Sequence, residues 1–305
     1  MDAAKQFDTV IIGGGIAGMT AAVYLARANH SCVVLESNIT GGLCNSTYTV
    51  ENFPSYTDIN GMELMQKVRD QVDALGVPVE EVCEITSLEL NGDTKRVHTD
   101  EGVYEAPTII LATGRKPLPL EVPTPSDQVH HCAICDGAPY KGKRVLVVGG
   151  GNSAFDESLY LMQLGVAHLT LVEVMPRFFA AEKTQDQLMA YKNVRTMKET
   201  RVHDLVVEHN VLTGAVLENT QTGARETIPV DGVFVFLGQL PNSRLFAHSI
   251  TLDKQGYVLA DANMQTNIPG VFSAGDINAK TFRQLTTAAA DGTIASLMAD
   301  RFLRR

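Results

Sequence analysis

The stretch Asp8-Thr9-Val10-Ile11-Ile12-Gly13-Gly14-Gly15-Ile16-Ala17-Gly18 decides the fold of the first part of the chain. Its apolar half predicts a buried strand, and an Ala-rich helix follows the glycines and extends to about Asn29. The spacing Gly13-x-Gly15-x-x-Gly18 permits a tight turn, close approach of the backbone to a pyrophosphate, and close packing of helix on strand. The free N–H groups at the start of the helix favour the phosphates of a dinucleotide.

An acidic side chain completes this pattern. A second strand, Cys32–Leu35, ends at Glu36, at about the expected separation of roughly 20 residues from the first glycine. A carboxylate at this place accepts hydrogen bonds from a ribose. A glycine-rich turn that binds nothing is the alternative. The order of strand, glycines, helix, strand and acid favours a nucleotide-binding domain.

The same plan occurs again in the middle of the chain. A strand at Arg144–Val148 enters the second glycine turn, a helix extends to about Leu164, and the strand Leu169–Val172 ends in an acid. The chain therefore contains an internal duplication with a second dinucleotide pocket. The residues predicted to form that pocket are Gly149, Gly151, Asn152, Ser153, Ala154 and Glu173.

The segment from about Leu245 onward begins no third copy. It contains a short strand ending in Gly275-Asp276 and an Ala-rich helix, which belong with the first domain. The predicted fold is therefore α/β, with two Rossmann-like, three-layer ββα domains, the second inserted into the first. We expect residues 1–115 and 245–305 to form the first domain, residues 118–243 the second, and residues 115–118 and 239–245 the linkers. Four prolines between Lys116 and Pro125 mark the first connection.

The rest of the first domain mixes helix and strand patterns. Met65, Val68, Val72 and Leu75 recur at three- and four-residue spacing, which predicts a helix with an apolar stripe in the core. Alternating strands with turns follow over residues 79–114. Cys44, after a glycine pair, is either a third redox thiol or a buried inert one.

Two cysteines lie ahead of the second glycine turn, in His131-Cys132-Ala133-Ile134-Cys135-Asp136-Gly137. Cysteines at this spacing close a small disulfide ring and carry two electrons reversibly. A zinc site would need a second pair at ligand spacing, and haem attachment needs a histidine after the second cysteine. An odd cysteine count and the lack of a signal peptide disfavour a structural disulfide. The motif predicts a redox pair and no metal.

Composition sets the class of protein and disfavours some partners. The 305 residues are 45% hydrophobic and 20% charged, which suits about two globular domains with full cores. The net charge of −10 disfavours nucleic acid, because phosphate binding needs a basic surface. No apolar run reaches the roughly 18–20 residues of a membrane span. We expect a cytoplasmic protein without a membrane segment.

These motifs resemble the low-molecular-weight thioredoxin reductases, a family of flavoprotein disulfide reductases, over essentially the whole chain. The resemblance lies in Gly13–Gly18 with Glu36, Glu51-Asn52-Phe53-Pro54, Cys132–Gly137, Pro269–Asp276, and Arg283-Gln284-Leu285 with Thr287–Gly292. It implies FAD in the first domain, a thioredoxin-like partner and a homodimer. The residues expected to bind FAD are Gly13, Gly15, Ala17, Gly18, Glu36, Gly42, Asn52, Thr113, Gly114, Gly275, Asp276, Arg283, Gln284 and Leu285.

The resemblance also implies roles in the cysteine motif. Cys135 faces the flavin, Cys132 exchanges with the protein disulfide, and Asp136 shuttles the proton. A carboxylate beside a thiolate pair is a sensible acid–base partner, although Asp136 before a glycine also suits a plain turn. His130 and His131 either stabilise a thiolate when protonated or are solvated loop residues.

The chain departs from the family at the second pocket. NADPH-dependent members carry a His-Arg-Arg run and a later arginine, which hold the 2′-phosphate. Here the positions read Glu173-Val174-Met175-Pro176-Arg177-Phe178-Phe179, and Glu173 would repel that phosphate and suit a free ribose hydroxyl. Arg177 is the only cation left in this run, and it stands outside the places where the family carries its arginines. NADP is therefore disfavoured, and NADH, a second bound FAD, or a ferredoxin that reduces the flavin directly are the candidate donors.

Two other functions fit the same motifs. A flavin-dependent dithiol oxidase would run the machinery backwards and pass electrons to oxygen. A non-enzymatic flavin redox sensor would bind a partner without turnover.

Overall fold

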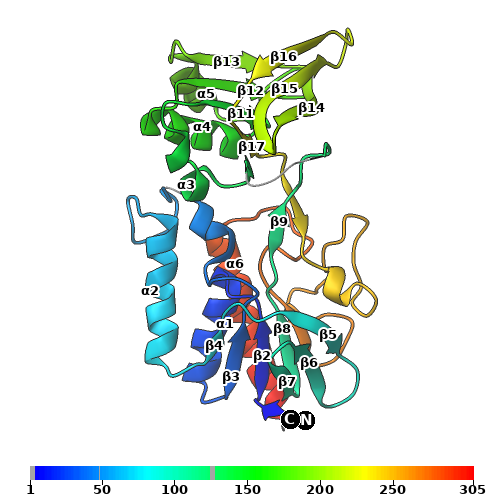
Figure 1. Cartoon of the computed structure of the whole chain (residues 1–305). Helices are drawn as coiled ribbons and strands as arrows, with labels where there is room; N and C mark the ends of the chain where they lie inside the picture. Colours follow the sequence, from blue (N-terminus) through cyan, green and yellow to red (C-terminus); the bar gives the residue numbers. More distant parts are fainter. Residues whose placement is uncertain (1–3, 48, 124–127) are drawn as a thin grey trace. The chain divides into compact units, whose positions relative to one another are not determined.

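The computed structural model describes residues 4–47, 49–123 and 128–305 and divides the chain into two compact units (Figure 1). The first holds Met1–Lys116 and Leu240–Arg305, and the second holds Pro117–Gln239. Residues 240–243, which we had assigned to the inserted domain, lie in the first unit. There Thr113 and Asn242 exchange two hydrogen bonds, each 2.9 Å long. Residues 124 and 125 of the predicted connection lie outside the described residues.

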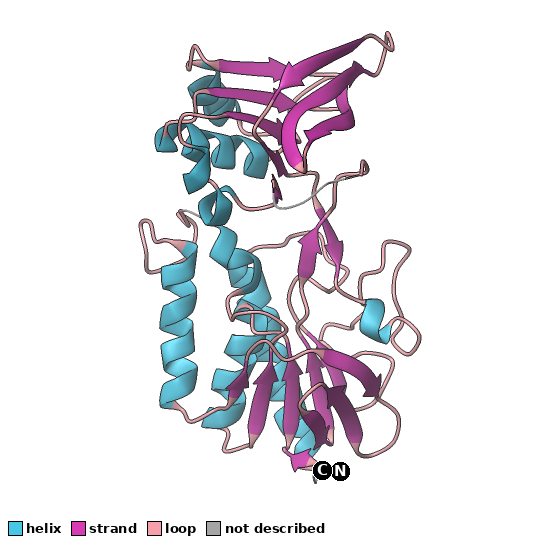
Figure 2. Cartoon of the chain, in the orientation of Figure 1, coloured by secondary structure: helices cyan, strands magenta, loops and turns pink. Residues whose placement is uncertain are grey.

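A five-stranded parallel sheet, in the order β19-β8-β2-β3-β4, is the central layer of the first unit. Helices cover one face of this sheet, and a four-stranded sheet in the order β1-β7-β6-β5 covers the other (Figures 1 and 2). The central strands are β2 (Thr9–Ile12), β3 (Cys32–Leu35), β4 (Val79–Glu80), β8 (Thr108–Leu111) and β19 (Val271–Ser273). The covering elements are β1 (Lys5–Gln6), β5 (Ile85–Glu89), β6 (Lys95–Thr99), β7 (Gly102–Ala106), α1 (Ile16–Arg27), α2 (Gly61–Ala74) and α6 (Leu285–Leu303).

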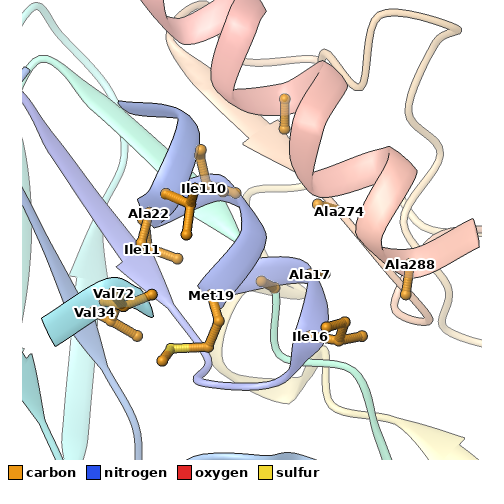
Figure 3. Packing of buried hydrophobic residues seen from close by; sticks show 14 of the residues in the cluster. Ile11, Ile16, Ala17, Met19, Ala22, Val34, Val72, Ile110, Ala274 and Ala288 are labelled. Atoms are coloured by element: carbon orange, nitrogen blue, oxygen red, sulfur yellow. The ribbon is translucent and has the colours of Figure 1, made fainter. Parts of the chain in front are cut away.

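Strand side chains alternate between the two faces, so both faces of the central sheet are apolar. Ile11 and Ile110 belong to the cluster that includes the helices, whereas Val10 and Ile109 belong to the cluster on the other side. Figure 3 shows α1 in this packing, with Met19 and Ala22 near Ile11 and Val34. The pairing of β19 with β8 confirms that the C-terminal segment returns to the first unit.

The predicted stripe on α2 is confirmed at three of its four positions. Met65 and Val72 are buried and Val68 packs against the same cluster, but Leu75 is 38% exposed. Leu75 differs because α2 ends at Ala74, so this residue is the C-cap and no longer follows the helical face.

The second unit repeats the plan with a parallel sheet in the order β10-β17-β11-β12-β13. Helices pack on one face, and an antiparallel sheet, β14-β15-β16, packs on the other. The parallel strands are β10 (Val129–His130), β11 (Arg144–Val148), β12 (His168–Val172), β13 (Val194–Met197) and β17 (Gly232–Val235). The remaining elements are α3 (Ala133–Asp136), α4 (Asn152–Leu164), α5 (Glu182–Met189), β14 (Thr200–Glu208), β15 (Val211–Asn219) and β16 (Arg225–Pro229).

Short elements complete the chain. The segments that pass between the units, β9 (Arg115–Pro117) and β18 (Gln239–Pro241), form a two-stranded sheet. The 3-10 turns are η1 (Gly42–Ser46), η2 (Ala138–Tyr140) and η3 (Arg244–Phe246). Among the described residues, none of the helices combines the length and the apolar character that crossing a bilayer requires.

Helices α1 and α6 approach each other backbone to backbone, because a Cβ atom on Gly292 would overlap the carbonyl oxygen of Ala17. We therefore expect Gly292→Ala to push the helices apart and to lower the free energy of unfolding of the first unit by about 1–3 kcal/mol. Urea unfolding followed by circular dichroism measures this. Thr293→Ala, at the next position of α6, is the control and should lower the free energy of unfolding by less than Gly292→Ala does. Equal stabilities of the two variants would contradict the close crossing.

Candidate active site

The first glycine turn makes an open cradle at the start of α1. Gly13 has φ +112°, and a Cβ atom there would overlap the carbonyl oxygen of Ala112, so only glycine fits. At Gly15, by contrast, a Cβ atom would meet no described atom within 4 Å, and no side chain caps the helix. Gly42 lies beside it, with its own Cβ position 3.5 Å from Gly15 Cα. Open space thus adjoins backbone N–H groups that lack a side-chain partner.

Glu36 closes one side of this turn. Its Oε2 accepts a hydrogen bond of 2.7 Å from the backbone N–H of Gly14, and its Oε1 accepts one of 2.9 Å from Asn38. These bonds fix the carboxylate at the end of β3, next to the cradle. Gly18 allows α1 to lie directly on the turn, because a Cβ atom there would overlap Gly13 O.

Several buried polar atoms of this unit make no hydrogen bond. In the described residues, Asp276 Oδ1, Arg283 Nε and Arg115 Nε are buried and make no hydrogen bond. The other Asp276 oxygen pairs with Arg115 at 3.0 Å, and the Arg283 guanidinium lies 4.1 Å from the centre of the Tyr257 ring. Lys280 Nζ lies 3.9 Å from Asp276 Oδ1, which is too far for a hydrogen bond. Buried polar groups are nearly always hydrogen-bonded, so the lack of a hydrogen bond on two predicted cofactor residues fits a polar ligand such as FAD.

The other predicted cofactor residues have mixed surroundings. Asn52 donates a 3.1 Å hydrogen bond to Gln284, which joins two predicted residues that are far apart in the sequence. Thr113, in contrast, uses its hydroxyl to bind Asn242. Positive φ angles of +58° and +86° at Gly114 and Gly275 explain the glycines there. Ala17 lies under Gly275, and Leu285 packs against the core at the start of α6.

Sequence reasoning gave no role to Asp291, which lies in the matched motif Thr287–Gly292 and is 8% exposed. It accepts hydrogen bonds from Gly275 N–H at 3.0 Å and from Lys280 Nζ at 2.7 Å. Asp291 therefore anchors the loop that carries Asp276. The sequence does contain one signal for this role, because an acidic residue is unusual within an alanine-rich helix.

The second glycine turn has the same geometry. Gly149 has φ +127°, and a Cβ atom on Gly151 would meet no described atom within 4 Å. Glu173 is 9% exposed at the end of β12, and its Oε1 accepts a 2.8 Å hydrogen bond from Met175 N–H, as Glu36 does from Asn38. Of the remaining predicted residues, Ala154 is fully buried, Ser153 is exposed, and Asn152 accepts a hydrogen bond from Ala181 N–H.

Two cations of the described residues lie beside the phenylalanines that follow Glu173. The Arg177 guanidinium is 4.9 Å from the centre of the Phe179 ring, and Lys198 Nζ is 5.0 Å from that of Phe178. Arg177 is the only cation in the run from 173 to 179. Sequence reasoning did not find Lys198, because this residue follows β13, the strand beside β12, and its neighbourhood depends on sheet order.

Cys132 and Cys135 form a disulfide at the start of α3. Cys132 is the N-cap residue, and its Sγ accepts a 3.1 Å hydrogen bond from Cys135 N–H. Cys132 is buried and Cys135 is exposed within this chain. Ring closure across two residues confirms the predicted pairing. The donor N–H at Cys132 Sγ would stabilise a thiolate on that atom after reduction.

A partly buried carboxyl group on α4 holds the cysteine segment. Glu157 Oε2 accepts a 2.7 Å hydrogen bond from Ala133 N–H, between the two cysteines. Burial raises the pKa of Glu157 to about 7, although backbone hydrogen bonds from Ala133 and Ile134 act in the opposite direction. Sequence reasoning missed Glu157, because an acidic residue on an amphipathic helix carries no mark of its partner.

The two histidines ahead of the cysteines make different contacts. His130 Nε2 lies 2.8 Å from the Tyr140 hydroxyl, and its Nδ1 lies 3.3 Å from Asp136 Oδ2. His131 Nδ1 lies 3.3 Å from the carbonyl oxygen of Val235. His130 therefore pairs with the predicted acid, a contact that neither of the two readings of this histidine foresaw.

The other three cysteines are free and buried. Burial raises the pKa of Cys44 to about 11, and its thiol donates to Gly61 O at 3.5 Å, so this residue is the inert thiol of the two alternatives. Across the described residues, no group of three or more His, Cys, Asp or Glu side chains is arranged to hold a metal ion.

Comparison with known proteins identifies the family. The family model described as pyridine nucleotide-disulphide oxidoreductase matches residues 7–292. The chain belongs to this family. It is 41% identical to the "34.2 kDa protein in rubredoxin operon" of Clostridium pasteurianum, over 98% of each chain. It is 34% identical to thioredoxin reductase of Listeria monocytogenes, over 98% of this chain and 94% of that one.

Solved structures agree with this family assignment. Thioredoxin reductase of Lactococcus lactis in its FR conformation aligns with a TM-score of 0.91 and 34% identity, covering 98% of this chain and 99% of that one. Thioredoxin reductase of T. acidophilum aligns with a TM-score of 0.90 and 30% identity, covering 97% and 98%. The α/β fold with two Rossmann-like domains is thus confirmed. The chain is a thioredoxin reductase-like flavoprotein disulfide oxidoreductase, a family that implies FAD.

The open space at Gly15 gives a direct test of the cradle. Gly15→Ala should leave the fold intact, because the added methyl meets nothing, but it should weaken FAD binding at least about tenfold by filling the phosphate approach. Equilibrium dialysis against FAD measures the affinity. Gly151→Ala, the same change in the second turn, should leave the flavin of the first unit in place. Equal FAD affinity of Gly15→Ala and wild type would contradict this assignment.

Glu157 makes stability depend on pH. Its folded-state pKa of about 7 exceeds the ordinary value of 4.5, so its contribution is full below about pH 4.5 and is lost as the pH rises through about 7. Glu157→Gln keeps the acceptor without the charge. We expect its stability relative to wild type to be greater at pH 8 than at pH 5, by about 1–3 kcal/mol. Denaturant unfolding at both pH values measures this, with Glu182→Gln, at the exposed start of α5, as the control. If Glu157→Gln gained the same stability over wild type at pH 5 and at pH 8, the result would argue against the burial of this charge.

Proposed function

We propose that this protein binds FAD in its first unit and passes two electrons through Cys132 and Cys135 to a thioredoxin-like protein disulfide. The Cys132–Cys135 disulfide at the start of α3 carries the proposal, since the family couples a flavin to such a pair. The names of the relatives, thioredoxin reductases of several bacteria, support the thioredoxin-like partner. We expect the active form to be a homodimer.

The first unit offers each part of FAD a matching group. The cradle at Gly13, Gly15 and Gly18 suits the pyrophosphate, and Glu36 suits the ribose of the adenosine. Asp276 Oδ1 and Arg283 Nε, which make no hydrogen bond, would find hydrogen-bond partners on the bound cofactor. Bound FAD supplies a two-electron carrier that reduces the disulfide.

The dithiol then reduces its partner by thiol–disulfide exchange. The Cys132 thiolate attacks one sulfur of the substrate disulfide, and the departing substrate thiolate takes a proton that Asp136 delivers. Cys135 then loses its proton, attacks Cys132 Sγ in the mixed disulfide and releases the second substrate thiol. The enzyme disulfide re-forms, and the substrate gains two electrons and two protons.

The order of attack is testable because the two sulfurs differ in environment. Cys132 receives an N–H hydrogen bond that favours its thiolate, whereas Cys135 is the exposed sulfur of the pair. We expect Cys135→Ser to form a stable mixed disulfide with thioredoxin through Cys132, and both single serine variants to lose turnover at least about 1,000-fold. Non-reducing electrophoresis and mass spectrometry identify the adduct. An adduct that forms only with Cys132→Ser would reverse the assigned roles.

We further propose that NADPH is not the physiological donor. Glu173 occupies in the second turn the place that Glu36 occupies in the first, and both accept a hydrogen bond from the N–H two residues on. A unit charge on a 2′-phosphate about 4 Å from this carboxylate would cost about 4 kcal/mol at an effective dielectric constant of about 20. Arg177 and Lys198 offset part of this cost. NADH, a second FAD or a ferredoxin meets no such repulsion.

Flavin counts and anaerobic reduction distinguish these donors. We expect NADPH to bleach the flavin at least about 100-fold more slowly than the physiological donor, tested as NADH and as reduced ferredoxin separately. Glu173→Gln should bring the rate of flavin bleaching by NADPH closer to the rate of bleaching by NADH. Two flavins per chain would identify the second FAD, and rapid aerobic turnover with a dithiol would identify an oxidase. Fast bleaching by micromolar NADPH would overturn the role given to Glu173.

A further inference from the structure

His130, Tyr140 and Asp136 form a connected group next to the Cys132–Cys135 disulfide. His130 ends β10, Tyr140 ends the η2 turn, and Asp136 ends α3 directly after Cys135. The imidazole lies between the other two groups, with Nε2 2.8 Å from the Tyr140 hydroxyl and Nδ1 3.3 Å from Asp136 Oδ2. Both ring nitrogens therefore have a partner.

Packing fixes the orientation of this imidazole. The centres of the Tyr140 and Phe234 rings lie 5.3 Å and 5.1 Å from the centre of the His130 ring. Tyr140 is buried against Gly232, where a Cβ atom would overlap its ring. The side chain of His130 retains 14% exposure, which leaves access to water. The ring is therefore held in place and can still exchange protons with solvent.

Asp136 lies directly after Cys135 and is in contact with His130. An imidazole is the side chain that ordinarily gains and loses a proton closest to neutral pH. The side chain of Asp136 is 42% exposed, and His130 is in contact with it. The imidazole is therefore placed to hold a proton and to pass it to the carboxylate with which it is in contact.

We propose that His130 is a positioning residue that supplies, through Asp136, the protons released and taken up in dithiol exchange. This inference rests on the proposed function and adds to it a residue that the cysteine motif itself does not contain. Tyr140 holds Nε2, so that Nδ1 faces the carboxylate in both protonation states of the ring.

His130, Asp136 and the dithiol together supply both protons that the substrate takes up. In the first exchange, the imidazolium of His130 gives its Nδ1 proton to Asp136, which protonates the departing substrate thiolate. Cys135 then loses its thiol proton to Asp136, and His130 takes this proton from Asp136 at Nδ1. The same proton returns through Asp136 to the second substrate thiolate. Two substrate thiols and one enzyme disulfide result, with neutral His130 and ionised Asp136.

Several charged groups surround this site. Burial lowers the pKa of His130, and the negative charge of Asp136 opposes this shift. Burial raises the pKa of Tyr140, so its hydroxyl keeps its proton. His131 faces Val235 O, Lys143 Nζ lies 5.4 Å from the centre of the Tyr140 ring, Asp231 is paired with Arg144, and Glu157 faces Ala133 N–H. Exchange should accordingly slow as the pH rises through the titration of His130.

The test compares His130→Asn with His131→Asn in the full FAD-loaded chain. Asparagine keeps an amide donor near the position of Nδ1 but carries no titratable proton, so it separates hydrogen bonding from proton supply. Each protein is reduced with dithiothreitol, which is then removed. The rate at which thioredoxin disulfide oxidises the enzyme dithiol is measured between about pH 5.5 and 9. Nuclear magnetic resonance of the imidazole protons gives the titration of His130 in wild type.

We expect the wild-type rate to fall with the titration of His130, and His131→Asn to behave as wild type. His130→Asn should lose this pH dependence and react about tenfold more slowly at pH 7. An unchanged rate and pH profile in His130→Asn would overturn the role of His130 and leave the proposed function standing. Failure of wild type and His131→Asn to exchange at any pH would overturn the proposed function, and this inference with it.

Discussion

Each unit depends on a turn where the backbone passes too close to a neighbouring carbonyl group for any side chain. At Gly13 the neighbour is Ala112 O, and at Gly149 it is Phe236 O. Both glycines have positive φ angles, which lets the chain turn at once from the central strand into a helix. The residue two positions on, Gly15 or Gly151, then faces open space over helix N–H groups that no side chain caps. A dinucleotide cradle follows directly from this constraint.

Duplication of the turn gives one chain two similar pockets whose differences are chemical. Glu36 and Glu173 occupy equivalent strand ends and bind backbone N–H groups in the same way. The second turn has the buried Ala154 where the first has Gly18, and Phe179 is half exposed beside Arg177. The cysteine motif belongs to the second copy, where Glu157 of the helix after the glycines holds it. The redox-active cysteine pair is thus part of the second nucleotide-binding domain.

The sequence predicted the two nucleotide-binding domains and the cysteine pair well, because the sequence signals for them are local. The chain must turn at Gly13 and Gly149, apolar runs lead into both turns, and two cysteines at this spacing close a ring whatever surrounds them. Contacts between distant elements were beyond such reasoning. Glu157 on Ala133, Asp291 under Gly275 and Lys198 beside Phe178 each depend on sheet order or helix packing. Leu75 was misplaced because a helix end shifts by one residue without a clear mark in the pattern.

An electron count tests the central claim, that flavin and dithiol work as one redox system, most directly. The FAD-loaded protein is titrated anaerobically with dithionite while flavin absorbance is recorded, beside the Cys135→Ser variant. The account predicts that wild type takes up about two electron equivalents more per chain than the variant before the flavin is fully bleached. Equal uptake by the two proteins would mean that the disulfide receives no electrons through the flavin, and would contradict the account.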